Sequence, residues 1–142
     1  MSDHIDPSLI QRTGLLANLE DDDIRGILGC GAEVGFDADQ VVFEQGARGD
    51  GLYVVLEGEV RVDVGGRFHV LKTGDFFGEM AVIAPGPRMA TVRATQPLRA
   101  IHISADDFQT FLLDHPAIAV SMLKTVVLRL REVEQRVEAW MG

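Results

Sequence analysis

The chain has 142 residues, 46% of them hydrophobic, and a formal net charge of -9. This length supports one compact core and is short for two domains of ordinary size. The acidic balance argues against a broad surface for nucleic acid or anionic membranes, because such surfaces need clustered Lys and Arg. We therefore expect a single domain in which any bound anion is recognised locally.

The single cysteine and the N-terminal residues exclude further classes of protein. Cys30 is the only cysteine, so neither an internal disulfide nor a zinc site built on several cysteines can form. The first residues, MSDHIDPSL, lack a basic segment followed by an apolar run, and no stretch has the roughly 18 uninterrupted apolar residues of a membrane span. We expect a soluble cytoplasmic protein with no membrane partner.

A helical pattern opens the chain and a strand pattern follows it. Apolar residues between Leu15 and Leu28 suggest short helical pieces, with residues 20–23 at a helix N-terminus and Gly29 after its end. Short runs rich in Val, Phe and Ile then alternate with glycines, which is typical of a β-sandwich or β-roll. The predicted strands cover residues 33–36, 41–44, 52–57, 60–64, 68–71, 90–95 and 99–103.

One hairpin is especially clear in the pattern. Val60, Val62 and Val64 alternate with polar residues, so we expect all three valines to face inward. Gly65 and Gly66 supply the positive φ values of a two-residue turn after this strand.

The period becomes helical again after Ile103. Ser104 with Asp107 predicts the start of a helix that runs to about Leu113, and Pro116 suits the first turn of a longer helix. Along the longer helix apolar residues recur at alternating spacings of four and three, namely Ala119, Leu123, Val126, Leu130, Val133, Val137 and Trp140. This stripe predicts a homodimer in the manner of a coiled coil. The alternatives are packing against the protein's own β-roll or binding of an unknown effector protein.

The segment from Gly74 to Ala94, GDFFGEMAVIAPGPRMATVRA, carries the chemistry. Gly78 permits close backbone approach, and residues 79–82 suit one helical turn whose free N–H groups face an anion. Arg88 adds a planar, permanently charged donor for phosphate oxygens. Glu79 would repel a phosphate but accepts a hydrogen bond from a sugar hydroxyl, so the segment has the polarity of a nucleotide site.

These residues resemble the phosphate-binding cassette of cyclic-nucleotide-binding domains, such as those of the catabolite activator and of protein kinase A regulatory subunits. The likeness is carried by FGEMA at residues 77–81 and PRMATVRA at residues 87–94, with upstream support at residues 42–46, 49–53 and 57–60, and it covers about residues 15–136. It implies a mainly β fold with flanking helices: a double-stranded β-helix, or jelly-roll-like β-roll, with short N-terminal helices and two C-terminal helices. Residues 1–142 would form one domain, with an N-terminal helical segment at 1–31, the β-roll at 32–103, the cassette at 74–94 and the C-terminal helices at 104–142.

The resemblance also implies roles for individual residues. Glu79 would bind the ribose 2′-hydroxyl and Arg88 the cyclic phosphate, while Met89 stands where guanine-selective members tend to carry Thr, which favours cyclic AMP over cyclic GMP. The expected ligand-binding residues are Phe77, Gly78, Glu79, Met80, Ala81, Arg88, Met89, Ala90, Val70 and Leu71. For Val70 and Leu71, core packing is the alternative role. The implied protein is a non-catalytic sensor without cofactor or metal, whose C-terminal helices relay occupancy.

Three other classes of protein are alternatives to a sensor domain. A jelly-roll metal enzyme would need clustered ligands, whereas His4, His69, His102 and His115 are dispersed along the chain. A fragment of a cyclic-nucleotide-responsive transcription factor would resemble this chain through the long helix, but the helix-turn-helix expected to follow it is not present before Gly142, so nucleic-acid polymers are not expected partners. The sensor of a channel is the third class, and residues 1–14 are too few to test it.

Overall fold

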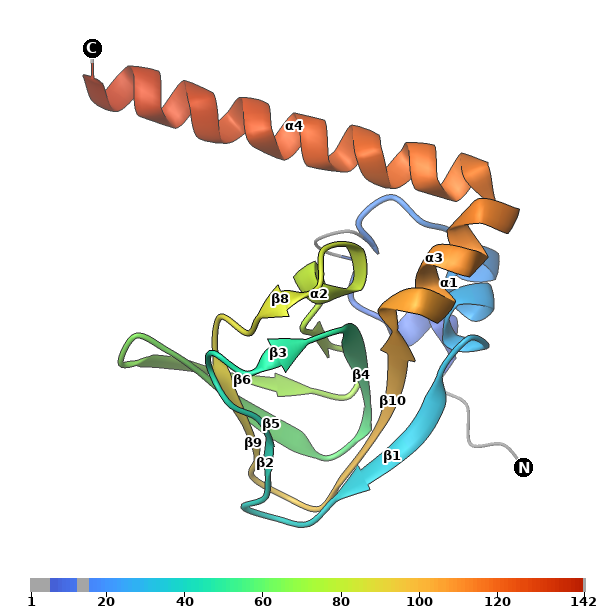
Figure 1. The fold of residues 1–142 in the computed structure, drawn as a ribbon, viewed down its shortest axis with the longest axis vertical. Helices are drawn as coiled ribbons and strands as arrows, with labels where there is room; N and C mark the ends of the chain where they lie inside the picture. Colours follow the sequence, from blue (N-terminus) through green and yellow to red (C-terminus); the bar gives the residue numbers. More distant parts are fainter. Residues whose placement is uncertain (1–5, 13–15, 142) are drawn as a thin grey trace.

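Short helices precede a β-roll, and a short and a long helix follow it (Figure 1). The computed structural model describes residues 6–12 and 16–141, and for Met80, Arg129 and residues 139–141 it describes the backbone alone. The helices are η1 (Pro7–Leu9, a 3-10 turn), α1 (Asp21–Leu28), α2 (Met80–Ile83), α3 (Ala105–Asp114) and α4 (Pro116–Met141). The strands are β1 (Ala32–Phe36), β2 (Val41–Phe43), β3 (Arg48–Gly49), β4 (Gly51–Glu57), β5 (Glu59–Val64), β6 (Arg67–Lys72), β7 (Phe76–Phe77), β8 (Gly86–Pro87), β9 (Thr91–Ala94) and β10 (Leu98–Ser104).

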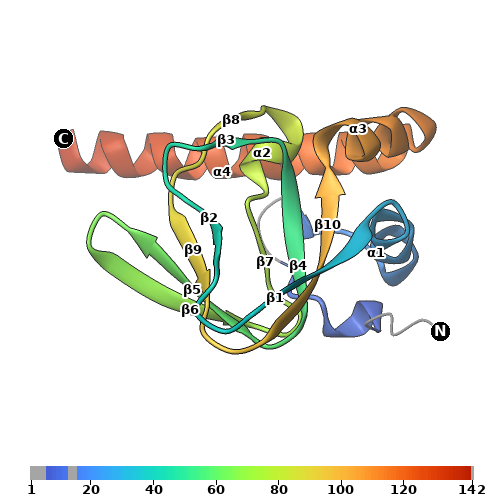
Figure 2. The same cartoon turned by 60° about the horizontal axis from the view of Figure 1, so that its bottom comes forward.

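Two four-stranded sheets form the roll, in the orders β1-β10-β4-β7 and β2-β9-β5-β6, and β3 pairs with β8 in a short ribbon. All of these pairings are antiparallel. Figure 2 shows the two sheets facing each other, with α1 and α3 on one side and the β5–β6 hairpin projecting on the other. The predicted mainly β fold with flanking helices is confirmed. Each predicted strand is present. Strands β3, β7 and β8 were missed, because each has two residues and such a short strand shows no periodicity.

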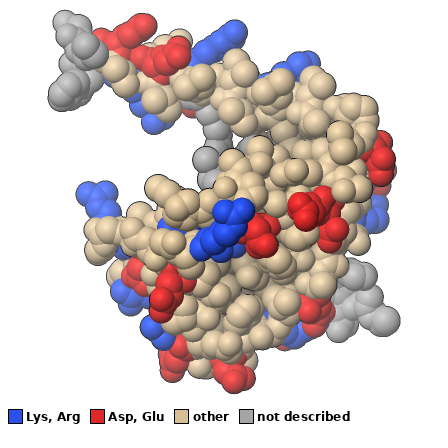
Figure 3. Space-filling model, in the orientation of Figure 1, with Lys and Arg blue, Asp and Glu red and all other residues tan. Residues whose placement is uncertain are grey.

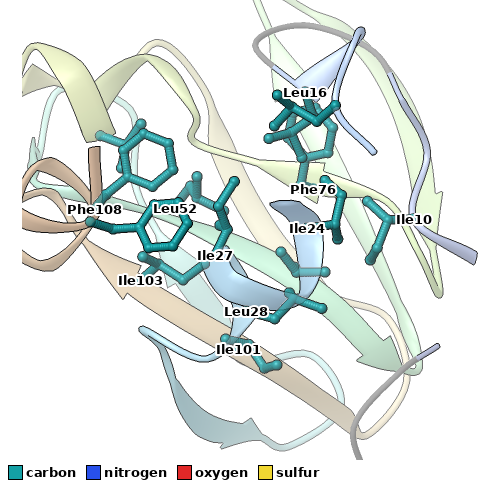
Figure 4. Close-up of a cluster of buried hydrophobic side chains, with 14 of the residues drawn as sticks. Ile10, Leu16, Ile24, Ile27, Leu28, Leu52, Phe76, Ile101, Ile103 and Phe108 are labelled. Carbon is teal, nitrogen blue, oxygen red and sulfur yellow. The ribbon is translucent and has the colours of Figure 1, made fainter. Parts of the chain in front are cut away.

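Two hydrophobic cores hold these layers together. The first lies between the β1-β10-β4-β7 sheet and the helices, and Figure 4 shows Leu52, Ile103 and Phe108 meeting there. The second lies between the two sheets. Strand β4 serves both cores, because successive side chains point to opposite faces: Leu52 and Val54 belong to the first core and Val55 to the second.

The β5–β6 hairpin shows where a local pattern held and where it did not. Gly65 and Gly66 have φ values of 55° and 83°, as the predicted two-residue turn requires. Val60 and Val62 are buried, but Val64 is 45% exposed, so the prediction that it faces the core was wrong. Val64 is the last residue of β5, next to the turn, and Figure 2 shows the β5–β6 hairpin projecting from the roll.

The helix boundaries follow capping side chains. Glu20 caps α1 in a reciprocal capping box with Asp23, and Ser104 caps α3 by accepting the backbone N–H of Asp107 over 3.1 Å. Pro116 begins α4, as predicted. Leu15, which the sequence placed in the first helical segment, lies outside the described residues.

Among the described side chains of helix α4, the buried ones lie along its first part. Ile118, Met122 and Thr125 are buried there. The predicted apolar stripe points elsewhere, and its exposed members are Leu123, Val126, Leu130, Val133 and Val137, at 45–61% exposure. The stripe therefore does not pack on the β-roll, while the Trp140 side chain lies outside the described residues. In the described part of the chain no single helix is long and apolar enough to cross a membrane, and only the bent pair of α3 and α4 meets that length and composition together.

Candidate functional site

A cavity of about 160 Å³ opens where β7 meets α2 and the β8–β9 segment. Its lining is Phe43, Val62, Phe77, Gly78, Glu79, Ala81, Pro87, Arg88, Met89, Ala90 and Val92. The walls are mostly apolar, and Glu79 and Arg88 are the acidic and basic groups among them. Such a combination suits a ligand with an apolar body and a few polar groups.

The chain turns sharply between β7 and α2, at Gly78. Gly78 has a φ of 77°, which favours glycine, and a Cβ added there would lie 2.5 Å from Nη1 of Arg88. The following turn is closed by the N–H of Ala81 donating to the Gly78 carbonyl over 3.2 Å. Val82 anchors this turn, because its side chain is fully buried in the core beneath the helices. Gly78 thus lets the backbone of this turn lie close to the Arg88 side chain.

Arg88 is buried, with 7% of its surface exposed. Its backbone pairs with the loop before β3, since its N–H donates to Ala47 over 2.7 Å and its carbonyl accepts from Gly46 over 2.8 Å. Its Nη1 donates to the carbonyls of Gly51 at 3.0 Å and Gly78 at 3.3 Å. Burial lowers the pKa of Arg88, and the nearby Tyr53 and Asp50 oppose that shift. The result is a cation held inside the domain at the wall of the cavity.

Glu79 is half-buried and lines the same cavity. The alternative in which Glu79 and Arg88 pair on an exposed loop does not describe this structure, because Arg88 is buried and its hydrogen bonds go to backbone carbonyls. Glu79 and Arg88 therefore line the same cavity.

The structure brings most of the expected ligand-binding residues together and separates two of them. Val70 pairs with Arg61 on the outer face of the sheet, is 41% exposed and does not line the cavity. Leu71 pairs with Val60 and packs on the core between the sheets, which is its alternative role. Met89 lines the cavity but is 74% exposed. The Met80 side chain lies outside the described residues.

Sequence reasoning did not include Pro87, which ends β8, and it missed two wall residues from outside the cassette, Phe43 and Val62. They come from β2 and β5, which lie on either side of β9 in one sheet. In the strand register both residues lie opposite Val92 of β9, one on each side of it. The inward alternation at Val62 was a usable signal, whereas nothing local linked Phe43 to the cassette.

Helix α4 stands apart from the cavity. Of its residues that the structure describes, none lines the cavity wall. Figure 3 shows the surface hollowed between the C-terminal half of α4 and the β-roll, with acidic and basic side chains interspersed on this face. The α4 side chains that the structure describes therefore do not enclose the cavity. Among residues 6–12 and 16–141 no group of three or more His, Cys, Asp or Glu is placed to hold a metal ion.

Known proteins share this fold and sequence pattern. The chain is similar to the CRP-like cAMP-activated global transcriptional regulator of Mycobacterium tuberculosis, with 28% identity over 129 residues that cover 87% of this chain and 58% of that protein. It is also similar to a cyclic nucleotide-gated potassium channel of Rhizobium etli, with 37% identity over 92 residues that cover 65% of this chain and 26% of that protein. The chain thus spans little more than half of the first relative and about a quarter of the second.

A solved structure gives the same result for the fold. The N-terminal domain of a transcriptional regulator from Streptomyces coelicolor A3(2) superimposes with a TM-score of 0.79 and 30% sequence identity, over 91% of this chain and 94% of that one. Residues 33–115, more than half of the chain, match the family model described as the cyclic nucleotide-binding domain. The chain belongs to the cyclic nucleotide-binding domain family.

Proposed function

We propose that this chain is a non-catalytic cytoplasmic sensor that binds cyclic AMP in the cavity between β7, α2 and β9. The observation that carries the proposal is Arg88, a buried cation at the wall of the same cavity that Glu79 lines. The cassette at residues 74–94 supplies most of this wall within a single domain.

Arg88 suits a cyclic phosphate because of its charge and its surroundings. A buried charge is costly unless a counter-charge or hydrogen bonds compensate for it. Among the described residues Arg88 makes no ion pair with a carboxylate, and two backbone carbonyls accept from it. A bound monoanion would supply the counter-charge and would form charge-assisted hydrogen bonds with the guanidinium.

Glu79 supports a ligand with a free sugar hydroxyl. A carboxylate near a phosphate site lowers affinity through like-charge repulsion unless it accepts a hydrogen bond from the same ligand. The ribose 2′-hydroxyl is such a donor in a 3′,5′-cyclic nucleotide, and it is absent from the 2′-deoxy analogue. Glu79 therefore favours ribose over deoxyribose ligands.

The size of the cavity indicates which part of the nucleotide it encloses. Its volume of about 160 Å³ is well below the roughly 300 Å³ at the lower end for small-molecule pockets. We infer that the sugar and phosphate fill it, and that the base extends beyond its wall beside Met89, which is 74% exposed. Movement of α4 over the base would then couple occupancy to the helix, to the extent that ligand affinity differs between the two positions.

The preference for cyclic AMP has two supports. Met89 offers no hydroxyl group to a guanine base at the mouth of the cavity. The similar regulator of M. tuberculosis is described as cAMP-activated. Cyclic GMP remains the alternative ligand.

The partner of this sensor is proposed to be a second copy of the chain. Exposed apolar residues form a stripe along α4 with the spacing of a coiled coil, at Leu123, Val126, Leu130, Val133 and Val137. Pairing of two such helices would bury the stripe. An effector protein that covers it is the alternative. The relatives suggest two settings for a longer protein, a transcriptional regulator or a channel.

A titration by calorimetry tests the proposed ligand. A cyclic mononucleotide has about 22 heavy atoms, and at roughly 0.3 kcal/mol per atom its affinity should be close to micromolar. Cyclic AMP should bind most tightly, then cyclic GMP, then linear AMP, whose second negative charge has no second cation in the wall. Preference for linear AMP, or no binding of any of the three, would refute the proposed function.

A further inference from the structure

The ring of Phe43 lies against the guanidinium of Arg88. The Cζ atom of Arg88 is 4.0 Å from the centroid of the Phe43 ring and 6.0 Å from that of Tyr53. A cation over an aromatic face within about 6 Å is attracted by the negative potential of that face, and the attraction grows when the pair is desolvated. Phe43 also lines the cavity, so it touches both the cation and the space for the ligand.

The guanidinium of Arg88 is held by the ring of Phe43 and by backbone carbonyls, and not by a carboxylate of the described residues. The two side-chain hydrogen bonds of Arg88 both leave from Nη1, toward Gly51 and Gly78. Within the described part of the chain no carboxylate forms an ion pair with it. Its Nε and Nη2 groups therefore remain as donors for oxygen atoms of a ligand.

Other aromatic side chains hold the Phe43 ring in turn. Its centroid lies 5.9 Å from that of Tyr53 and 5.8 Å from that of Phe77, and those two rings stack at 5.1 Å with an angle of 7° between their planes. The three rings come from β2, β4 and β7, which belong to two different sheets. The Phe43 ring is thus fixed by packing of the roll.

We propose that Phe43 is a positioning residue that presets Arg88 for an anionic ligand. This inference rests on the proposed function. The ring face restrains the guanidinium before the ligand arrives and leaves its positive charge uncancelled. A carboxylate at the same place would restrain the side chain equally well, but it would repel the phosphate. An aliphatic residue would neither attract the guanidinium nor repel the phosphate. The guanidinium would then lose its orientation each time the ligand is released.

Matched substitutions test this role by titration with cyclic AMP. Phe43→Met keeps a similar apolar volume but removes the ring face, and binding should weaken roughly 3- to 30-fold. Phe43→Tyr keeps the ring and should stay within about twofold of the parent chain. Phe36→Met is the control, because Phe36 packs on Tyr53 at 6.4 Å in the same core but does not line the cavity. Unchanged affinity in Phe43→Met, or an equal loss in Phe36→Met, would overturn the proposal.

A spectroscopic measurement on the nucleotide-free protein gives an independent readout. Protons held above a ring face are shielded, so the Nε–H resonance of Arg88 should be shifted upfield, and it can be assigned by its loss in Arg88→Lys. The shift should persist in Phe43→Tyr and disappear in Phe43→Met. An unshifted resonance in the parent chain would overturn the role of Phe43 even if the variants do not fold. If no cyclic nucleotide binds while the shift is present, the ligand assignment fails and the contact between Phe43 and Arg88 stands.

Discussion

Asn18 donates its side-chain amide to the hydroxyl of Thr125 over 2.9 Å, and this hydrogen bond joins the segment before α1 to the long helix α4. Thr125 is only 5% exposed, and its own hydroxyl donates to the Ser121 carbonyl over 3.2 Å. Beyond it, from Val126 to Glu138, every α4 side chain that the structure describes is exposed. The bond between Asn18 and Thr125 therefore marks the point at which α4 leaves the domain.

Loss of this hydrogen bond should destabilise the domain. Thr125→Val keeps the shape of the side chain but removes the acceptor for Asn18, and we expect the free energy of unfolding to fall by about 1 kcal/mol. Urea unfolding followed by circular dichroism measures this change. Thr110→Val, at an exposed position on α3, is the control and should change stability by less than about 0.5 kcal/mol. Equal effects of the two substitutions would show that the hydrogen bond adds nothing to the free energy of unfolding.

Arg88→Ala should weaken cyclic AMP binding by about 2–5 kcal/mol, because the phosphate would be buried without its counter-charge. Calorimetry measures the loss. Arg93→Ala, in the strand that follows the Arg88 loop, is a matched control, since Arg93 is exposed and donates to the Asp39 carbonyl outside the cavity. A loss below threefold in Arg88→Ala would remove its assigned role.

Glu79→Gln should reduce affinity by about 1 kcal/mol, because a neutral amide oxygen accepts a weaker hydrogen bond than a carboxylate does. The variant should also discriminate less between cyclic AMP and 2′-deoxy cyclic AMP. Glu44→Gln, at an exposed position outside the cavity wall, is the control. If the parent chain binds the 2′-deoxy ligand as tightly as cyclic AMP, Glu79 does not hold the ribose.

Leu130→Glu should convert a dimer into monomers. Leu130 is 55% exposed on the apolar stripe of α4, and a carboxylate there would be buried and unpaired in a helix pair. Light scattering coupled to size-exclusion chromatography measures the mass. Gln135→Glu adds the same charge at another exposed position of α4 and should leave the dimer intact. A parent chain that stays monomeric at high concentration would contradict pairing through this stripe.

His102 should make stability depend on pH below neutrality. Burial lowers the pKa of His102, with Asp50 raising it and Arg88 lowering it further. The folded state therefore binds fewer protons than the unfolded chain just below the ordinary imidazole pKa of about 6.5, so stability falls as the pH drops through that range. We expect the difference in melting temperature between the parent chain and His102→Gln to change between about pH 7 and pH 5. A constant difference across that range would show that His102 is not responsible.

Most of the secondary structure could be predicted because its signals are local. Alternation at Val60 and Val62, the turn at Gly65 and Gly66, and Pro116 at a helix start each act over a few residues. The cassette was recognisable for the same reason, since Glu79 and Arg88 lie in one short segment. The exposed Val64 and the outward Val70 escaped prediction, because alternation says which residues share a face but not where the core ends.

The sequence by itself determined that the chain forms a β-roll with a charged cassette, and that an apolar stripe runs along its last helix. Only the tertiary structure decided what surrounds the cassette: it set the ring of Phe43 against Arg88, buried the arginine, and turned the stripe of α4 away from the roll. The physical reason is the distance along the chain over which each signal acts. Propensity and periodicity act between neighbours in sequence, whereas the approach of β2 to the cassette depends on strand register and on packing between sheets.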